Sequence, residues 1–196
     1  MTKIKAAKNS SKKDVIINKA AALFRTKGFI ATSMRDLADA VGVEAPSLYN
    51  HIGSKGEILT VICFKVADSF NKQLEDTESE NWNAAEKIEN IIRFHITMMV
   101  NNFNEVFVAN NEWKYLEDPF LQTFLNQRRA YEKRLITLIE TGIKKNKFKV
   151  INPYVAVLTL LSAVRGLGFW QKNNKNINAK ELEDDMVNHL ISGLIK

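Results

Sequence analysis

Residues 32–59 have the sequence TSMRDLADAVGVEAPSLYNHIGSKGEIL, and this stretch decides the fold. Its apolar spacing predicts one short helix over 34–41 and a second over 45–51, with a turn between them. Gly42 can adopt the positive φ that such a turn needs. Two short helices joined in this way form a helix-turn-helix, whose second helix enters the major groove of DNA. The stretch therefore predicts a DNA-binding segment.

The charge of the chain is concentrated around this stretch. Residues 1–56 hold ten Lys and Arg against four Asp and Glu, a balance of +6, whereas residues 57–196 hold eighteen of each. A local excess of positive charge attracts a polyanion and speeds its encounter with the protein. The alternatives are a solvated basic N-terminus and, for the basic arm over 1–11, a disordered tail. Because the charge coincides with the helix-turn-helix, the pattern favours nucleic acid.

Three Ser-x-x-acid motifs mark expected helix starts: Ser11 with Asp14, Ser33 with Asp36, and Ser54 with Glu57. In each motif the serine oxygen can accept a hydrogen bond from a free N–H of the first helical turn. The acid can accept in return from the N–H of the serine. An apolar helical period follows each motif, so each predicts a helix.

Helical periods continue to the end of the chain, and no β-type alternation has useful length. We expect further helices over 12–26, from 55 onward, and over 84–101, 103–116, 119–145, 153–172 and 179–195, with an acidic loop over 75–83. Asp118 and Asn152 precede prolines and are expected helix caps. The sequence thus predicts an all-α fold of about nine helices in two domains. Residues 1–54 form the DNA-binding domain and residues 55–196 a domain for effector binding and dimerisation.

Composition narrows the class of protein. Hydrophobic residues make up 45% of the chain and charged residues 26%, which is typical of a soluble globular protein. No apolar run is long enough to cross a bilayer and no secretory signal is visible, so we expect a cytoplasmic protein without a membrane partner. Cys63 is the only cysteine. No metal-ligand spacing, phosphate-binding loop or nucleophile–base arrangement is present, so we expect no metal, no cofactor and no enzymatic activity.

The N-terminal residues resemble the tetracycline-repressor (TetR) family of bacterial transcription regulators. The matching segments are Ala20-Ala-Ala-Leu-Phe24, Lys27-Gly-Phe29, Thr32-Ser-Met-Arg-Asp-Leu-Ala38, Val41-Gly-Val43, Ser47-Leu-Tyr-Asn-His51 and Ser54-Lys55. The resemblance implies a two-footed homodimer, with a three-helix DNA-binding domain and a C-terminal effector domain in each subunit. It also implies that a small molecule releases the protein from its operator. Glu44 stands where the family often has Ser or Thr, and Ile52 where it often has an aromatic residue.

The candidate DNA contacts lie on and around the second helix of the motif. Base contacts are expected from Ala45, Pro46, Ser47 and Asn50, with Glu44 able to accept from a cytosine amino group. The resemblance implies phosphate contacts for Tyr49 and His51, with a core role for Tyr49 and a structural hydrogen bond for His51 as alternatives. Thr32 and Ser33 are expected to form an anion site at the start of their helix. Lys55 is expected to neutralise a phosphate.

The candidate effector site is a set of aromatic, Met and polar residues in the C-terminal part, which can line an adaptable pocket. The candidates are His95, Met99, Phe103, Phe107, Trp113, Phe124, Arg128 and Trp170. His95 and Arg128 are the groups expected to orient a ligand. Ordinary core packing is the alternative for each residue, and for Arg128 a solvated surface charge is equally open. Glu112-Trp113, Arg128-Arg129, Tyr131 and the region of Trp170 are similar to a subgroup that senses fatty acyl-coenzyme A (acyl-CoA).

The segments 153–172 and 179–195 are expected to form the homodimer contact as a four-helix bundle with their symmetry mates. Gly166 and Gly168 lie in the first of these segments and suggest the close approach of another backbone or a ligand. The leading hypothesis is a repressor released from a palindromic double-stranded DNA operator by a small apolar or amphipathic effector. An architectural DNA-binding protein without an effector is the alternative.

Overall fold

The computed structural model describes residues 12–170 and 178–196. For residues 169 and 170 it describes the backbone alone. Its α-helices are α1 (Lys12–Lys27), α2 (Met34–Val41), α3 (Ala45–Tyr49), α4 (Lys55–Ser79), α5 (Ala84–Asn101), α6 (Phe103–Asn111), α7 (Phe120–Lys144), α8 (Pro153–Trp170) and α9 (Ala179–Leu194). A short 3₁₀ helix, η1 (Trp113–Tyr115), follows α6. The prediction of an all-α fold with about nine helices is confirmed over the described residues.

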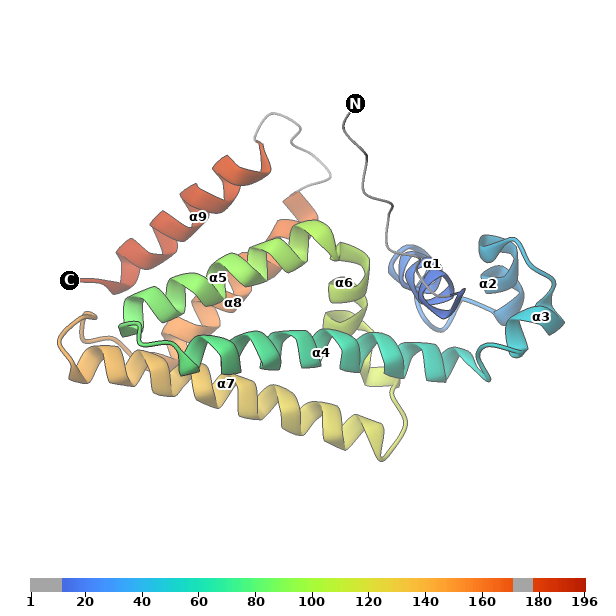
Figure 1. The fold of residues 1–196 in the computed structure, drawn as a ribbon, viewed down its shortest axis with the longest axis horizontal. Helices are drawn as coiled ribbons and strands as arrows, with labels where there is room; N and C mark the ends of the chain where they lie inside the picture. Colours follow the sequence, from blue (N-terminus) through green and yellow to red (C-terminus); the bar gives the residue numbers. More distant parts are fainter. Residues whose placement is uncertain (1–11, 171–177) are drawn as a thin grey trace, which may run out of the picture.

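The helices form an elongated molecule with a small head at one end (Figure 1). The head consists of α1, α2 and α3, and the long helix α4 runs from it along the body, side by side with α7. In the body, α5 packs against α7, α8 and α9. Helix α6 lies between head and body, where it packs against both α1 and α4. The head therefore rests on the body through two helices, α4 and α6.

Two of the three predicted serine motifs cap their helices, and Ser33 forms the full reciprocal motif. The Ser33 oxygen accepts from the N–H of Asp36 at 3.1 Å, and the Asp36 carboxylate accepts from the N–H of Ser33 at 2.7 Å. The Ser54 oxygen accepts from the N–H of Glu57, but the Glu57 carboxylate accepts from the N–H of Gly53 rather than of Ser54. Ser11 lies outside the described residues.

Several predicted boundaries were wrong. The acidic stretch expected as a loop from residue 75 continues α4 to Ser79. The segment 103–116 breaks into α6 and η1, and α3 ends at Tyr49 instead of at residue 51. Pro119, without a side-chain cap, precedes α7 where Asp118 was expected to cap it. Asn152 does cap α8, since its side-chain oxygen accepts from the N–H groups of Tyr154 and Val155.

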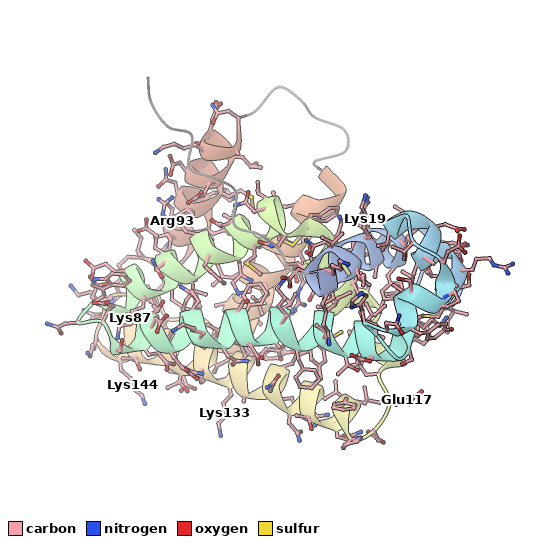
Figure 2. The ribbon with its side chains drawn as sticks, turned by 45° about the vertical axis from the view of Figure 1, so that its right-hand side comes forward. Lys19, Lys87, Arg93, Glu117, Lys133 and Lys144 are labelled. Carbon is pink, nitrogen blue, oxygen red and sulfur yellow. The ribbon has the colours of Figure 1, made fainter. Side chains whose placement is uncertain are left out.

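The extension of α4 has causes that lie far away in the sequence. The buried Thr77 hydroxyl donates to the side chain of Asn90 in α5 at 2.9 Å. Arg134 of α7 forms an ion pair with Glu78 at 2.6 Å, and the Lys87 ammonium donates to the Glu78 carbonyl at 2.7 Å. Figure 2 shows Lys87 at the end of the molecule where α4 turns into α5. These partners hold the last turn of α4 helical although its local sequence is acidic and polar.

An ion-pair cluster attaches α9 to the body. The Arg93 guanidinium on α5 contacts Asp184 at 2.8 Å and Glu183 at 3.0 Å on α9, and also Glu89 on its own helix (Figure 2). Hydrogen bonds to these carboxylates, that to Asp184 first, raise the pKa of Arg93. The position of α9 against α5 thus rests on charge as well as on apolar packing.

Candidate nucleic-acid interface and ligand cavity

The sequence anchors α3 on one side and exposes it on the other. Leu48 is completely buried, whereas Tyr49 keeps 52% of its surface exposed. Glu44, Pro46, Asn50 and His51 are exposed, and Ala45 and Ser47 are half-buried. Glu44 makes no side-chain capping bond at the start of α3. The exposure of Tyr49 argues against the alternative of a core aromatic residue.

Tyr49 also borders a hollow between two helix starts. The hollow has a volume of about 360 Å³ and is lined by residues 30–34, by Tyr49 and by residues 53–55. The first turns of α2 and α4 therefore face the same space. Free N–H groups and helix dipoles make such positions favourable for a phosphate.

Two residues expected to face a phosphate have internal partners instead. The Thr32 side chain is buried, and its hydroxyl donates to the Gly28 carbonyl at 2.7 Å. The Lys55 ammonium donates to the carbonyls of Phe29, Ile30 and Thr32 at 3.0–3.1 Å, which uses all three of its N–H groups. It also lies 4.7 Å from the centre of the Phe29 ring. Both residues hold the turn before α2, a role that differs from the predicted one.

Ser33 is exposed as expected, but its cap carries a negative charge close by. The Asp36 carboxylate forms an ion pair with Lys27 at 2.8 Å and accepts from both the hydroxyl and the N–H of Ser33. Hydrogen bonds from Lys27 first, and then from Ser33, hold the pKa of Asp36 far below its ordinary range. Lys27 therefore balances the charge that would otherwise repel a phosphate from this helix start.

A cavity of about 70 Å³ lies inside the body between α4, α5, α6, α7 and α8. Of the predicted ligand residues, His95, Met99, Phe124 and Arg128 line it together. Apolar side chains such as Val66, Phe70 and Leu161 form much of the wall. The cavity is thus an apolar space with a few polar groups, which is typical of sites for small molecules.

The polar groups of the cavity include a pair formed by the half-buried His95 and the buried Tyr131. The Nε2 atom of His95 lies 2.8 Å from the Tyr131 hydroxyl, and the imidazole stacks on Phe70 with 4.3 Å between ring centres. Burial, followed by the positive charge of Arg165, lowers the pKa of His95 to about 3. Burial also raises the pKa of Tyr131. Both groups are therefore neutral at physiological pH and act as hydrogen-bonding groups only.

The remaining predicted ligand residues lie elsewhere. Phe103 and Phe107 line a second hollow of about 260 Å³, which shares Met99, Asn110 and Arg165 with the first cavity. Trp113 lines neither space, but the Arg128 guanidinium lies 5.6 Å from its ring centre. The side chain of Trp170 lies outside the described residues. Of the two glycines of α8, only Gly168 is closely approached, because a Cβ there would lie 2.2 Å from Phe103; nothing lies within 4 Å of such an atom at Gly166.

Sequence reasoning missed five polar residues of the cavity wall, namely Asn71, Asn110, Gln127, Glu132 and Arg165. For Gln127 a signal existed, since it lies three residues after Phe124 and four before Tyr131, on the same face of a helix. For Arg165 no comparable signal existed, because a charge in an amphipathic helix normally faces solvent.

The wall of the cavity is connected to the head through α6 and η1. Glu112, at the end of α6, accepts from the N–H of Phe29 at 3.1 Å. The Phe29 ring stacks on Tyr115 of η1 at 5.5 Å, and Arg25 donates to the Asn104 side chain of α6. The turn that carries α2 is therefore held by Lys55 at the start of α4 and by Glu112 at the end of α6.

An exposed α3 on a basic head, joined to a helical body with an internal cavity, defines a helix-turn-helix DNA-binding protein with a ligand-binding domain. Two family models match the chain: "Bacterial regulatory proteins, tetR family" over residues 16–62 and "Tetracyclin repressor-like, C-terminal domain" over residues 81–194. The chain belongs to the TetR family of transcription regulators.

Individual relatives agree with this assignment. The HTH-type transcriptional repressor KstR2 of Mycobacterium tuberculosis (strain H37Rv) is 22% identical over 145 residues, which cover 74% of this chain and 72% of the relative. The structure of the ketosteroid transcriptional regulator KstR2 of Mycobacterium tuberculosis superposes with a TM-score of 0.89 at 19% identity, over 97% of this chain and 98% of the other. AibR in complex with isovaleryl coenzyme A and operator DNA gives a TM-score of 0.80 at 22% identity, over 92% and 98% of the two chains.

The described residues show two further features that bear on function. Within them, no helix has the length and apolar character needed to span a membrane. In the same residues, no three His, Cys, Asp or Glu side chains gather where they would hold a metal ion.

Proposed function

We propose that this protein is a homodimeric repressor that leaves a palindromic operator when a small amphipathic effector enters its body. The observation that carries the proposal is the cavity between α4 and α8, whose helices α4 and α6 also hold the head. A ligand that fits one arrangement of these helices better than another shifts the equilibrium between them. The shift changes the spacing of the two α3 helices and therefore the affinity for DNA.

The DNA face consists of exposed or half-exposed groups around α3. In the proposal, Glu44, Ala45, Pro46, Ser47 and Asn50 contact bases, while Ser33, Tyr49 and His51 contact phosphates. Thr32 and Lys55 shape the turn before α2 and so present its N-terminus to the backbone of the DNA. The basic arm over 1–11 adds charge near the operator.

The dimer is proposed to form through α8 and α9. Three large apolar side chains on α8 are exposed: Tyr154 at 61%, Val155 at 52% and Leu158 at 50%. Gly166 is exposed on the same helix without a neighbour inside the chain, which leaves room for the backbone of a partner. Large apolar side chains exposed together on one helix are typical of a protein–protein contact.

Fatty acyl-CoA compounds are the first effectors to test. The structural neighbour AibR is a complex with isovaleryl coenzyme A, and the cavity offers an apolar space with neutral hydrogen-bonding groups. The cavity also favours this proposal over an architectural DNA-binding protein, which has no use for an internal ligand space.

The test begins with DNA fragments selected from a random library by the full-length protein. Native mass spectrometry of the selected complex is expected to show two chains of 22.3 kDa on one duplex. Titration with short and medium acyl-CoA compounds is then expected to release the labelled DNA, as measured by fluorescence anisotropy. A single chain on the DNA would refute the proposed dimer. A DNA affinity that no ligand of the cavity changes would refute the proposed release by an effector.

A further inference from the structure

Two arginine side chains face the cavity without an acidic partner. Arg128 of α7 and Arg165 of α8 both line it, as does one carboxylate, Glu132 of α7, but among the described residues neither arginine forms an ion pair. By contrast, Arg93 contacts three carboxylates and Arg134 contacts Glu78, while Arg129 is exposed to solvent and forms no ion pair among the described residues. Arg128 and Arg165 therefore differ from these arginines in lining a cavity without an ion-pair partner.

The position of Arg128 is electrostatically unfavourable as it stands. The side chain is half-buried and packs its guanidinium against the rings of Trp113 and Phe124, at 5.6 and 5.8 Å from their centres. Burial first, and then the positive charge of Arg165, lowers the pKa of Arg128, while Glu132 acts in the opposite direction. A buried charge without a paired counter-charge is costly, and an anion between the two guanidinium groups would relieve that cost.

A second observation points to a ligand in the same space. Gln127 lines the cavity, and its Oε1 atom is buried without a hydrogen-bond partner. Buried polar atoms in folded proteins are nearly always hydrogen-bonded, so an unpartnered acceptor on a cavity wall calls for a donor from outside the chain. His95 and Tyr131 do not supply it, because they bond to each other.

We propose that the cavity binds an amphipathic anion. A short apolar chain lies among Val66, Phe70 and Leu161, a carboxylate or phosphate lies between Arg128 and Arg165, and an O–H or N–H of the ligand donates to Gln127. The volume of about 70 Å³ limits the length of the chain, so short chains are tested. This inference rests on the proposed function in taking the bound anion to be the effector.

The chemistry leaves two sources for the anion, a free carboxylic acid or the phosphates of a coenzyme A thioester. Binding to the full-length protein is measured by calorimetry with hexanoate, hexan-1-ol, hexanoyl-CoA and coenzyme A. We expect hexanoate or hexanoyl-CoA to bind at least about tenfold more tightly than hexan-1-ol, because a charge-assisted bidentate contact is lost with the alcohol. Binding of hexanoate identifies the carboxylate as the anion, whereas binding of hexanoyl-CoA and coenzyme A without hexanoate identifies the phosphates.

Three variants assign the contact. Arg128→Gln and Arg165→Gln are each expected to weaken binding of the anionic probe by about tenfold and to leave binding of hexan-1-ol unchanged. Arg165 is exposed, so its substitution tests the site even where Arg128→Gln reduces folding. Arg129→Gln is the matched control, since Arg129 is the neighbouring arginine on α7, is exposed, and does not line the cavity; its guanidinium donates to the Asn126 side chain at 3.5 Å.

Several outcomes would overturn the inference. These are binding of hexan-1-ol as tight as that of the anionic probes, unchanged binding in both Arg128→Gln and Arg165→Gln, and no binding of either anionic probe at millimolar concentration. The failure of this inference is distinct from that of the proposed function. Release of DNA by a neutral ligand alone would refute the anion site and leave the proposed ligand-released repressor standing. An anion that binds without changing the affinity for DNA would support the anion site and refute its role as the effector.

Discussion

Lys55 gives the sharpest test of how the head presents its DNA face. Its ammonium group donates to three carbonyls of the turn over residues 29–32 and lies over the Phe29 ring. The substitution Lys55→Met keeps the apolar stem of the side chain and removes only the charged donor. If Lys55 positions the turn, the variant loses stability and DNA affinity together, without losing a contact to a phosphate.

The expected magnitudes follow from these contacts. Hydrogen bonds to a charged group contribute about 1.5–3 kcal/mol. We apply this free energy once and not three times, because a single ammonium group makes all three hydrogen bonds. Lys55 is half-buried, so in the variant water can bind the carbonyls in place of the ammonium. For a chain of this size, 1 kcal/mol shifts Tm by roughly 2–4 °C, so Tm is expected to fall by about 3–12 °C. Operator affinity is expected to fall by at least about tenfold, because fewer molecules hold the competent turn.

The assay that separates positioning from direct contact is the salt dependence of operator binding. A phosphate contact contributes about 0.9 to the slope of log K against log[salt], and a dimer with two such contacts would lose about 1.8. We expect a weaker affinity with an unchanged slope. A slope reduced by about that amount, at unchanged Tm, would show that Lys55 contacts phosphate and refute the reasoning. Lys19→Met, which removes the same charge from an exposed position on α1 (Figure 2), is the control for stability.

Two further predictions concern the body. Burial lowers the pKa of His95 to about 3 in the folded protein, so acid protonates this group in the unfolded chain first. The free energy of unfolding is therefore expected to fall as the pH drops from about 6.5 towards 3, by up to about 1.4 kcal/mol per pH unit. Chemical denaturation of His95→Gln should lack this contribution. An equal pH dependence in both proteins would show that His95 is accessible to protons in the folded state. Gly168→Ala would place a Cβ 2.2 Å from Phe103. Although alanine is the better helix former, the variant is expected to lose about 1–3 kcal/mol of unfolding free energy, as measured by urea denaturation. Gly193→Ala, where nothing lies within 4 Å, should show no such loss, and equal stabilities of the two variants would mean that Phe103 yields without cost.

Local signals in the sequence were sufficient for most of the fold. The capping motifs at Ser33 and Ser54 and the glycine at position 42 depend on residues at most four positions apart, and they form in the structure. Gly42 adopts the positive φ of 80° that the turn requires. Such features can be predicted because the interacting groups are neighbours in the chain.

The errors arose where distant residues decide. The acidic end of α4 is helical because Arg134, 56 residues later, pairs with Glu78, and no local pattern contains that partner. The internal partners of Lys55 were missed for the same reason, because the carbonyls that its ammonium contacts lie 23–26 positions earlier in the chain. Which polar residues face the cavity depends on the rotation of α7 and α8 against each other. For this reason Arg165 could be identified only from the structure, whereas Gln127 shares a helix face with Phe124 and Tyr131 and could have been found from its spacing.

Helix α4 has a consequence for how this protein can be divided. Its first turns supply Ile58, Leu59 and Ile62 to a core that is continuous with Phe24 and Leu48 of the head, while Val66 and Phe70 of the same helix line the cavity. The two functional regions therefore share a structural part and have no linker between them. A fragment cut at residue 54 would leave the head without the residues that close its core. Chimaeras that exchange sensor domains among relatives would have to carry α4 and its partner α6 together as one piece.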